Sequence, residues 1–126
     1  MSETEHSRKQ APALRLRIVF GGGVMLGPGK ADLLDGIRET GSIAAAARAM
    51  NMSYKRAWML VETMNAAFQE PVVQSSRGGS AGGGASLTQT GAAVVAEYRK
   101  LQKITAEAGA DRVAALQAML KDPPGT

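Results

Sequence analysis

The sequence predicts a mainly α-helical fold with a small β component, and three observations lead to this prediction. A short alanine-rich segment and a longer amphipathic segment follow each other within residues 41–69, with only a tight turn between them. Two short apolar runs then flank a glycine-rich loop, and a long segment with helical periodicity comes last. The order helix, turn, helix, hairpin is that of a winged helix-turn-helix, here followed by a long C-terminal helix.

The composition allows one domain. The 126 residues are 44% apolar, enough for one modest core, so we expect a single domain over residues 13–121 between a disordered tail at 1–12 and a short tail at 122–126. Fifteen Lys and Arg against eleven Asp and Glu leave a net charge of +4, which favours a polyanionic partner. Without a secretory signal or an apolar run of membrane-spanning length, we expect a cytoplasmic protein that does not enter membranes.

Alternation of apolar residues predicts a first strand near the N-terminus. The apolar residues at every second position are Leu14, Leu16, Ile18 and Phe20. This is the pattern of a strand with one buried face. Three glycines at 21–23 end the strand, and a short return strand is expected at 24–26.

Two short helices are expected next, at about 30–40 and 43–50. Gly41 is placed to end the first helix in the left-handed conformation, and the hydroxyl of Ser42 can cap the second. The buried stripe of the second helix consists of Ile43, Ala46, Ala47 and Met50. Because small side chains let another helix approach closely, this stripe suits a helix-turn-helix.

The third helix is expected to begin after Ser53, a second N-cap, and to run to about Gln69. Asn51 can adopt the left-handed conformation of the sharp turn before it, and Pro71 forbids continuation beyond it. Trp58, on one flank, is expected to be partly buried packing rather than a base contact. The buried stripe is expected to consist of Ala57, Leu60, Val61, Met64 and Phe68.

A hairpin, the wing, is expected at about 72–87, and a C-terminal helix capped by Thr88 at about 88–121 with a pause near Gly109. Five of the eight residues at 77–84 are glycine, so backbone amides there can approach an anionic surface. A flexible linker is the other meaning of such a composition, but apolar runs on both sides favour a hairpin.

The start of the third helix carries the chemistry for binding duplex DNA. Free N–H groups and the positive end of the helix dipole favour phosphate there. Arg56 can read guanine, and Lys55 can do the same or neutralise a phosphate, although both also fit an ordinary solvated helix face. The predicted DNA contacts are Ser42, Ser53, Tyr54, Lys55, Arg56, Met59, Arg77, Gly78, Gly79, Ser80, Gly82 and Gly83.

The last helix is expected to pair with a second copy of the chain. Its apolar stripe consists of Val94, Val95, Tyr98, Leu101 and Ile104. A small winged domain does not cover such a stripe alone, and a partner helix would bury it. Packing within one chain is the alternative.

Catalysis and metal binding lack the residues they need. The single histidine, His6, lies in the N-terminal tail, there is no cysteine, and no carboxylate pair lies beside a nucleophile, so we expect no enzyme, no cofactor and no metal site. The leading interpretation is a sequence-specific DNA-binding transcriptional regulator. The alternative is a single-domain protein-interaction partner that modulates a full-length regulator without sensing a ligand itself.

Several motifs together resemble a known family. They are Gly41-Ser42-Ile43 with the alanine run, Met52-Ser53-Tyr54-Lys55-Arg56-Ala57-Trp58, Met64-Asn65, the glycines at 78–79 and 82–84, and Leu87-Thr88 with Gly91. Over roughly residues 14–105 the chain resembles the N-terminal winged-helix domain of the molybdate-responsive ModE regulators, and over 41–91 it more loosely resembles the DNA-binding domain of LysR-type regulators.

This resemblance implies a dimeric transcriptional regulator whose recognition helix enters the major groove of a palindromic site. The last helix would form the dimer. Family members that sense molybdate carry C-terminal oxyanion-binding domains, which these 126 residues do not include. We therefore expect DNA binding without direct molybdate sensing.

Overall fold

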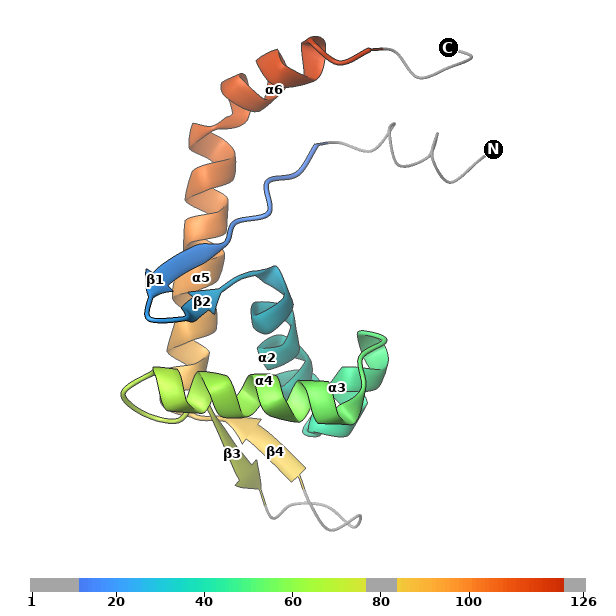
Figure 1. Cartoon of the computed structure of the whole chain (residues 1–126), viewed down its shortest axis with the longest axis vertical. Helices are drawn as coiled ribbons and strands as arrows, with labels where there is room; N and C mark the ends of the chain where they lie inside the picture. The colour runs from blue at the N-terminus through green and yellow to red at the C-terminus, as the bar shows by residue number, and fades with distance from the viewer. Residues whose placement is uncertain (1–11, 77–83, 122–126) are drawn as a thin grey trace.

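The structure, a computed structural model, describes residues 12–76 and 84–121. Its elements are β1 (Ile18–Gly21), β2 (Val24–Leu26), α2 (Pro28–Thr40), α3 (Ile43–Ala49), α4 (Tyr54–Ala67), β3 (Val73–Ser76), β4 (Gly84–Leu87), α5 (Gln89–Ala108) and α6 (Ala110–Ala118). In Figure 1, α2, α3, α4 and the hairpin β3–β4 gather at one end of the long α5, and α6 follows at its other end. The predicted fold class, a mainly helical winged helix-turn-helix, is confirmed. The predicted tails, apart from Pro12, lie outside the described residues.

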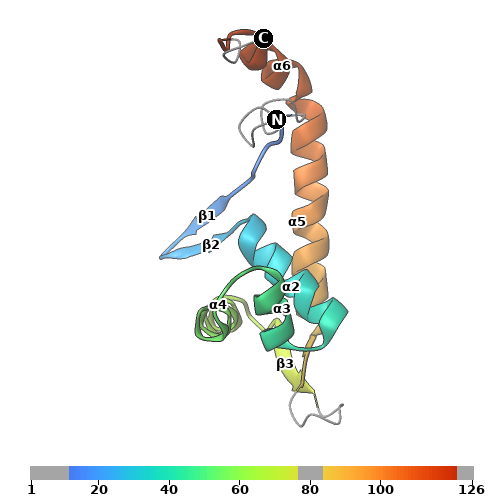
Figure 2. The same ribbon diagram turned by 90° about the vertical axis from the view of Figure 1, so that its right-hand side faces the viewer.

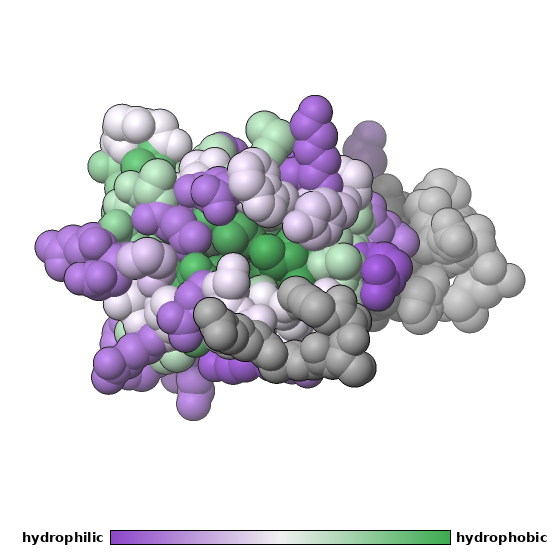
Figure 3. All heavy atoms as spheres, turned by 90° about the horizontal axis from the view of Figure 1, so that it is seen from below, coloured by the Kyte–Doolittle hydropathy of each residue, from purple (hydrophilic) through white to green (hydrophobic). Residues whose placement is uncertain are grey.

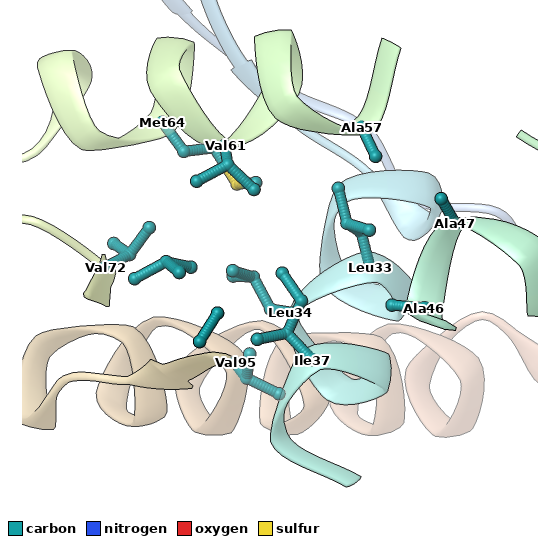
Figure 4. Packing of buried hydrophobic residues seen from close by; sticks show 12 residues of the cluster. Leu33, Leu34, Ile37, Ala46, Ala47, Ala57, Val61, Met64, Val72 and Val95 are labelled. Carbon is teal, nitrogen blue, oxygen red and sulfur yellow. The ribbon is translucent and has the colours of Figure 1, made fainter. Parts of the chain in front are cut away.

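The hydrophobic core lies where α2, α3 and α4 meet (Figure 4). The predicted alanine stripe is confirmed, since Ala46 and Ala47 of α3 are buried against α2 and α4. A side-chain carbon added to Gly36 of α2 would lie only 3.0 Å from the Cβ of Ala46, so the two helices are closely packed. The other buried residues of this cluster are Leu33, Leu34, Ile37, Ala57, Val61, Met64, Val72, Val73, Ala85 and Val95.

The predicted helix ends are confirmed by their backbone geometry. Gly41 has φ 72° and Asn51 has φ 54°, the left-handed conformation expected at both turns. The hydroxyl groups of Ser42 and Ser53 each accept a hydrogen bond of 3.1 Å from the backbone N–H three residues later. The caps thus separate α2, α3 and α4 by two sharp turns.

Three element ends differ from the prediction. The first helix already begins at Pro28, which suits the first helical position because proline lacks the N–H that would be unpaired there. Helix α4 ends at Ala67 rather than Gln69, because Phe68 leaves the helical conformation with ψ 161°. The C-terminal helix consists of α5 and α6, which meet at Gly109, and it ends at Ala118 instead of 121.

The predicted N-terminal strand with one buried face is only partly correct. Strands β1 and β2 do pair antiparallel, but Leu14 and Leu16 precede the strand. Leu14 is 43% exposed and Phe20 is 57% exposed, whereas Leu16 and Ile18 are half-buried. Only the part of the strand around Ile18 is covered, because Ile18 packs against the buried cluster of Leu26, Ala31 and Tyr98.

Side-chain hydrogen bonds fix α5 to the N-terminal half of the chain, which lies along one side of it in Figure 2. The buried hydroxyl of Tyr98 donates a hydrogen bond of 2.5 Å to the carbonyl of Leu16, and burial raises the pKa of that hydroxyl. Arg99 donates to Asp32 at 2.8 Å and to Asp35 at 2.7 Å, and these hydrogen bonds raise the pKa of its guanidinium. Helix α5 therefore holds α2 in place.

Candidate nucleic-acid interface

One face of the molecule, shown in Figure 3, carries α3, α4 and the hairpin β3–β4. Its centre is apolar and hydrophilic residues surround that centre. A groove between α4 and the hairpin, the α4–β3 groove, includes Tyr54, Trp58 and Glu62 of α4 and Gln74 and Ser75 of β3 in its lining. Of the predicted DNA contacts, Ser42 and Tyr54 line this groove, whereas Ser53, Lys55, Arg56 and Met59 line a second groove along α4.

The N-terminal end of α4 is exposed and cationic. Tyr54 is 56% exposed and Met59 is 53% exposed, and Lys55, Arg56 and Ser53 are also exposed. Within residues 12–76 and 84–121, neither Lys55 nor Arg56 forms a salt bridge with an acidic side chain. Both positive charges are therefore available to a ligand at this face.

Trp58 is partly buried, as predicted. It remains 46% exposed and lies in the lining of the α4–β3 groove, one helical turn after Tyr54. That it packs rather than contacts a base stays a prediction. The groove thus has an exposed aromatic pair on its α4 side.

The predicted wing is confirmed as a hairpin in its described part. Strands β3 and β4 pair antiparallel from Val73 opposite Leu87 to Ser76 opposite Gly84. Figure 1 shows the hairpin projecting from the body of the molecule beside α4. The predicted contacts Arg77, Gly78, Gly79, Ser80, Gly82 and Gly83 lie outside the described residues and stay predictions.

Asn65 holds the base of the hairpin against α4, a role that sequence reasoning missed. Its Oδ1 accepts hydrogen bonds from the backbone N–H of Val72 at 2.8 Å and of Val73 at 3.1 Å, and its Nδ2 donates to the Val73 carbonyl at 3.2 Å. Both valines are buried. The sequence signals were an amide at the edge of an apolar stripe and the presence of Met64-Asn65 among the family motifs, and neither indicates this contact.

We expect Asn65→Ala to lower the free energy of unfolding by about 2–3 kcal/mol, because it leaves two backbone N–H groups without partners in a buried place. Chemical denaturation measures this change. The matched control is Gln69→Ala, at an exposed position just after α4, which should change stability by less than about 0.5 kcal/mol. An equal small effect of both substitutions would contradict the role assigned to Asn65.

Two further contacts join the hairpin to the rest of the domain. The backbone N–H of Ala85 in β4 donates to the Gly41 carbonyl at 2.9 Å, in the turn between α2 and α3. Thr88 donates to the Val72 carbonyl through its backbone N–H at 3.0 Å and to the Pro71 carbonyl through its hydroxyl at 2.6 Å. The hairpin, α3 and the start of α5 are therefore held as one unit beside α4.

The residues predicted for dimerisation do not form one exposed stripe. Val95 and Tyr98 are each only 2% exposed because the chain itself covers them, and Val94 is half-buried. Leu101 is 38% exposed and Ile104 is 62% exposed. Only the second half of the predicted stripe is thus open to a partner.

Two other kinds of site are not found in residues 12–76 and 84–121. No group of three or more His, Cys, Asp and Glu side chains there has the arrangement to hold a metal ion. None of the helices described is long and apolar enough to span a membrane.

Known proteins similar to this chain match its N-terminal two thirds. It is 45% identical over 80 residues to the molybdenum-pterin-binding protein MopB of Rhodobacter capsulatus and 42% identical over 80 residues to the molybdenum transport protein ModE of Azotobacter vinelandii. It is 36% identical over 81 residues to the DNA-binding transcriptional dual regulator ModE of Escherichia coli K12. Each match covers 64% of this chain but only 30% or 31% of the relative, so the chain spans less than a third of the length of these relatives.

The fold has a counterpart among solved structures. The crystal structure of the CbnR DNA-binding domain in complex with DNA superposes with a TM-score of 0.55 at 20% identity, covering 70% of this chain and 95% of that one. At this identity the likeness concerns the fold alone. Residues 31–92 match the family of bacterial regulatory helix-turn-helix proteins of the lysR type. This range covers most of α2, all of α3 and α4 and the described part of the hairpin, so residues 31–92 match a LysR-type regulatory helix-turn-helix domain.

Proposed function

We propose that this chain is a sequence-specific DNA-binding transcriptional regulator that inserts α4 into the major groove of duplex DNA. The observation that carries the proposal is the exposed, cationic start of α4, the helix that lies beside the hairpin in Figure 1. The match to a regulatory helix-turn-helix family and to a relative named as a DNA-binding transcriptional regulator, ModE of Escherichia coli K12, supports it. Residues 77–83 would then meet the DNA backbone or the minor groove beside α4.

Each exposed residue at the start of α4 has a suitable partner on DNA. Arg56 can donate two hydrogen bonds to the N7 and O6 atoms of guanine, and Lys55 can do likewise or bind a phosphate. The hydroxyl of Tyr54 can donate to a phosphate oxygen, and the side chain of Met59 can contact a thymine methyl group. The hydroxyls of Ser42 and Ser53, besides capping their helices, can donate to phosphates at the edge of the face.

Binding of the unmodified chain to random and genomic duplexes tests this function. Fluorescence anisotropy of labelled DNA measures the binding constant. When the logarithm of this constant is plotted against the logarithm of the salt concentration, each phosphate contact contributes roughly 0.9 to the negative slope. Trp58, the single tryptophan, is 46% exposed in the groove and gives a second signal from the protein. Binding without any sequence preference, or no binding, would contradict the proposal.

We further propose that two copies pair through an apolar surface on α5 and β1. This dimer surface consists of Phe20, Val94, Leu101 and Ile104, which line one groove. Phe20 is 57% exposed and Ile104 is 62% exposed, so the described chain leaves both largely uncovered. Burying apolar side chains of this size against a second copy favours association.

We expect Ile104→Asp to weaken the dimer at least tenfold, because a carboxylate must then be buried among apolar side chains. Sedimentation velocity over a range of concentrations measures this. Leu116→Asp on α6, at a position that is 64% exposed but outside the dimer surface, serves as the control and should leave association unchanged. If both variants behave like the unmodified chain, or if the unmodified chain is monomeric at micromolar concentration, the proposed surface is wrong.

A second candidate function is that of a partner for a full-length regulator. Helix α6 supports it, because none of its residues is buried and Leu116, Met119 and Leu120 at its end are 64–77% exposed. Such an apolar face suits a protein partner. Co-purification with a full-length ModE-type regulator, together with no DNA binding by the chain alone, would favour this function over the first.

A further inference from the structure

Three exposed residues form a stripe on the side of α4 that points away from the core, and one of them, Glu62, is acidic. This outward stripe consists of Lys55, Met59 and Glu62, at helical positions i, i+4 and i+7, all of them exposed. At 1.5 Å of rise per residue the stripe is about 10 Å long, or about three base pairs of B-DNA. The stripe is thus long enough for its two ends to meet different base pairs.

Glu62 is an unexpected residue on a face that meets a polyanion. It lies in the lining of the α4–β3 groove beside Trp58, and no salt bridge to it is found within residues 12–76 and 84–121. A carboxylate near phosphates is repelled, so it weakens binding to every DNA sequence unless a particular base compensates for it. The compensating group must be a hydrogen-bond donor, because a carboxylate only accepts.

We propose that Glu62 determines sequence specificity by accepting a hydrogen bond from the N4 amino group of a cytosine. The inference rests on the proposed entry of α4 into the major groove. In that groove guanine presents only acceptors and thymine an acceptor and a methyl group, so both repel or fail to bond a carboxylate. Adenine has a donor at N6, but its N7 acceptor lies beside it and disfavours the carboxylate.

The geometry of the outward stripe also sets where this cytosine lies. Lys55 and Glu62 occupy its two ends, so the base pairs that they meet are separated by about three steps along the duplex. Met59 lies between Lys55 and Glu62 on the stripe and would face the base pairs between these two. The site bound by one chain therefore contains one position with a cytosine preference, about three base pairs from the base or phosphate that Lys55 contacts.

Selection of bound sequences from random duplexes tests the inference with the full chain and two variants. The unmodified chain is expected to prefer cytosine at one position by about fivefold to a hundredfold. Glu62→Gln should change the preference at that position from cytosine to adenine, since an amide bonds both N6 and N7 of adenine. Glu62→Ala should lose the preference at that position and keep all others.

Glu70→Gln is the matched control, because it removes one exposed carboxylate just beyond the end of α4. It should raise affinity slightly for all sequences and change no base preference. If the two Glu62 variants do the same, the residue acts by charge alone and the inference is overturned. If the unmodified chain selects no sequence at all, the proposed function itself fails, which separates the two conclusions.

Discussion

Replacing Lys55 and Arg56 together by alanine is expected to weaken binding to a selected duplex about a hundredfold. Arg56 and Lys55 are exposed at the capped start of α4, where a recognition helix first meets the major groove. One bidentate contact to guanine contributes about 1–3 kcal/mol of discrimination. Each lost phosphate contact also lowers the salt-dependence slope by about 0.9. We expect no loss of stability, because both side chains are exposed and Ser53 keeps its capping hydrogen bond to the backbone.

The control is a second double variant, Lys103→Ala with Arg112→Ala, at exposed positions of α5 and α6. It also removes one lysine and one arginine, but from the part of the molecule that lies away from α4 and the hairpin in Figure 1. Its effect should be limited to a small, sequence-independent loss of affinity. Equal losses in the two double variants would mean that net charge alone drives binding, and α4 would lose its proposed role as recognition helix.

The elements that the sequence predicted best are those specified by local backbone chemistry. Gly41 and Asn51 both adopt the left-handed conformation, and Ser42, Ser53 and Thr88 all cap helices as expected. These features depend on a few neighbouring residues and not on distant packing. The helix-turn-helix order follows directly from them, which is why the fold class could be predicted without a structure.

The errors concern residues whose surroundings come from distant parts of the chain. Tyr98, which was predicted for the dimer stripe, is buried because β1, β2 and α2 cover its part of α5, whereas Leu14 and Phe20 of the first predicted strand stay exposed. Periodicity identifies an apolar stripe but not which segment covers it. The role of Asn65 depends on a loop seven residues further along the chain, so only the fold could reveal it.

Gly91→Ala is expected to have the largest effect on stability, lowering the free energy of unfolding by about 3 kcal/mol. A Cβ at this position would lie 2.1 Å from the carbonyl oxygen of Val72, where α5 begins directly against the base of the hairpin. That oxygen also accepts the hydrogen bond from the Thr88 backbone N–H, so it cannot move away without breaking a second contact. The sequence showed Gly91 only as part of a family motif, whereas the structure gives the physical reason for it.

The matched control is Gly29→Ala, also in the first turn of a helix, where an added Cβ meets nothing within 4 Å. Because alanine is the better helix former, this control should stabilise the chain by up to about 1 kcal/mol. Thermal and chemical denaturation compare the stabilities of the two variants, and stabilisation of the chain by both substitutions would contradict the close approach at Val72.

Since Val72 is also bonded to Asn65 of α4, the clash at Gly91 should displace the hairpin relative to the recognition helix. At temperatures where the Gly91→Ala variant is still folded, its DNA affinity should therefore fall while the affinity of the Gly29→Ala variant stays unchanged.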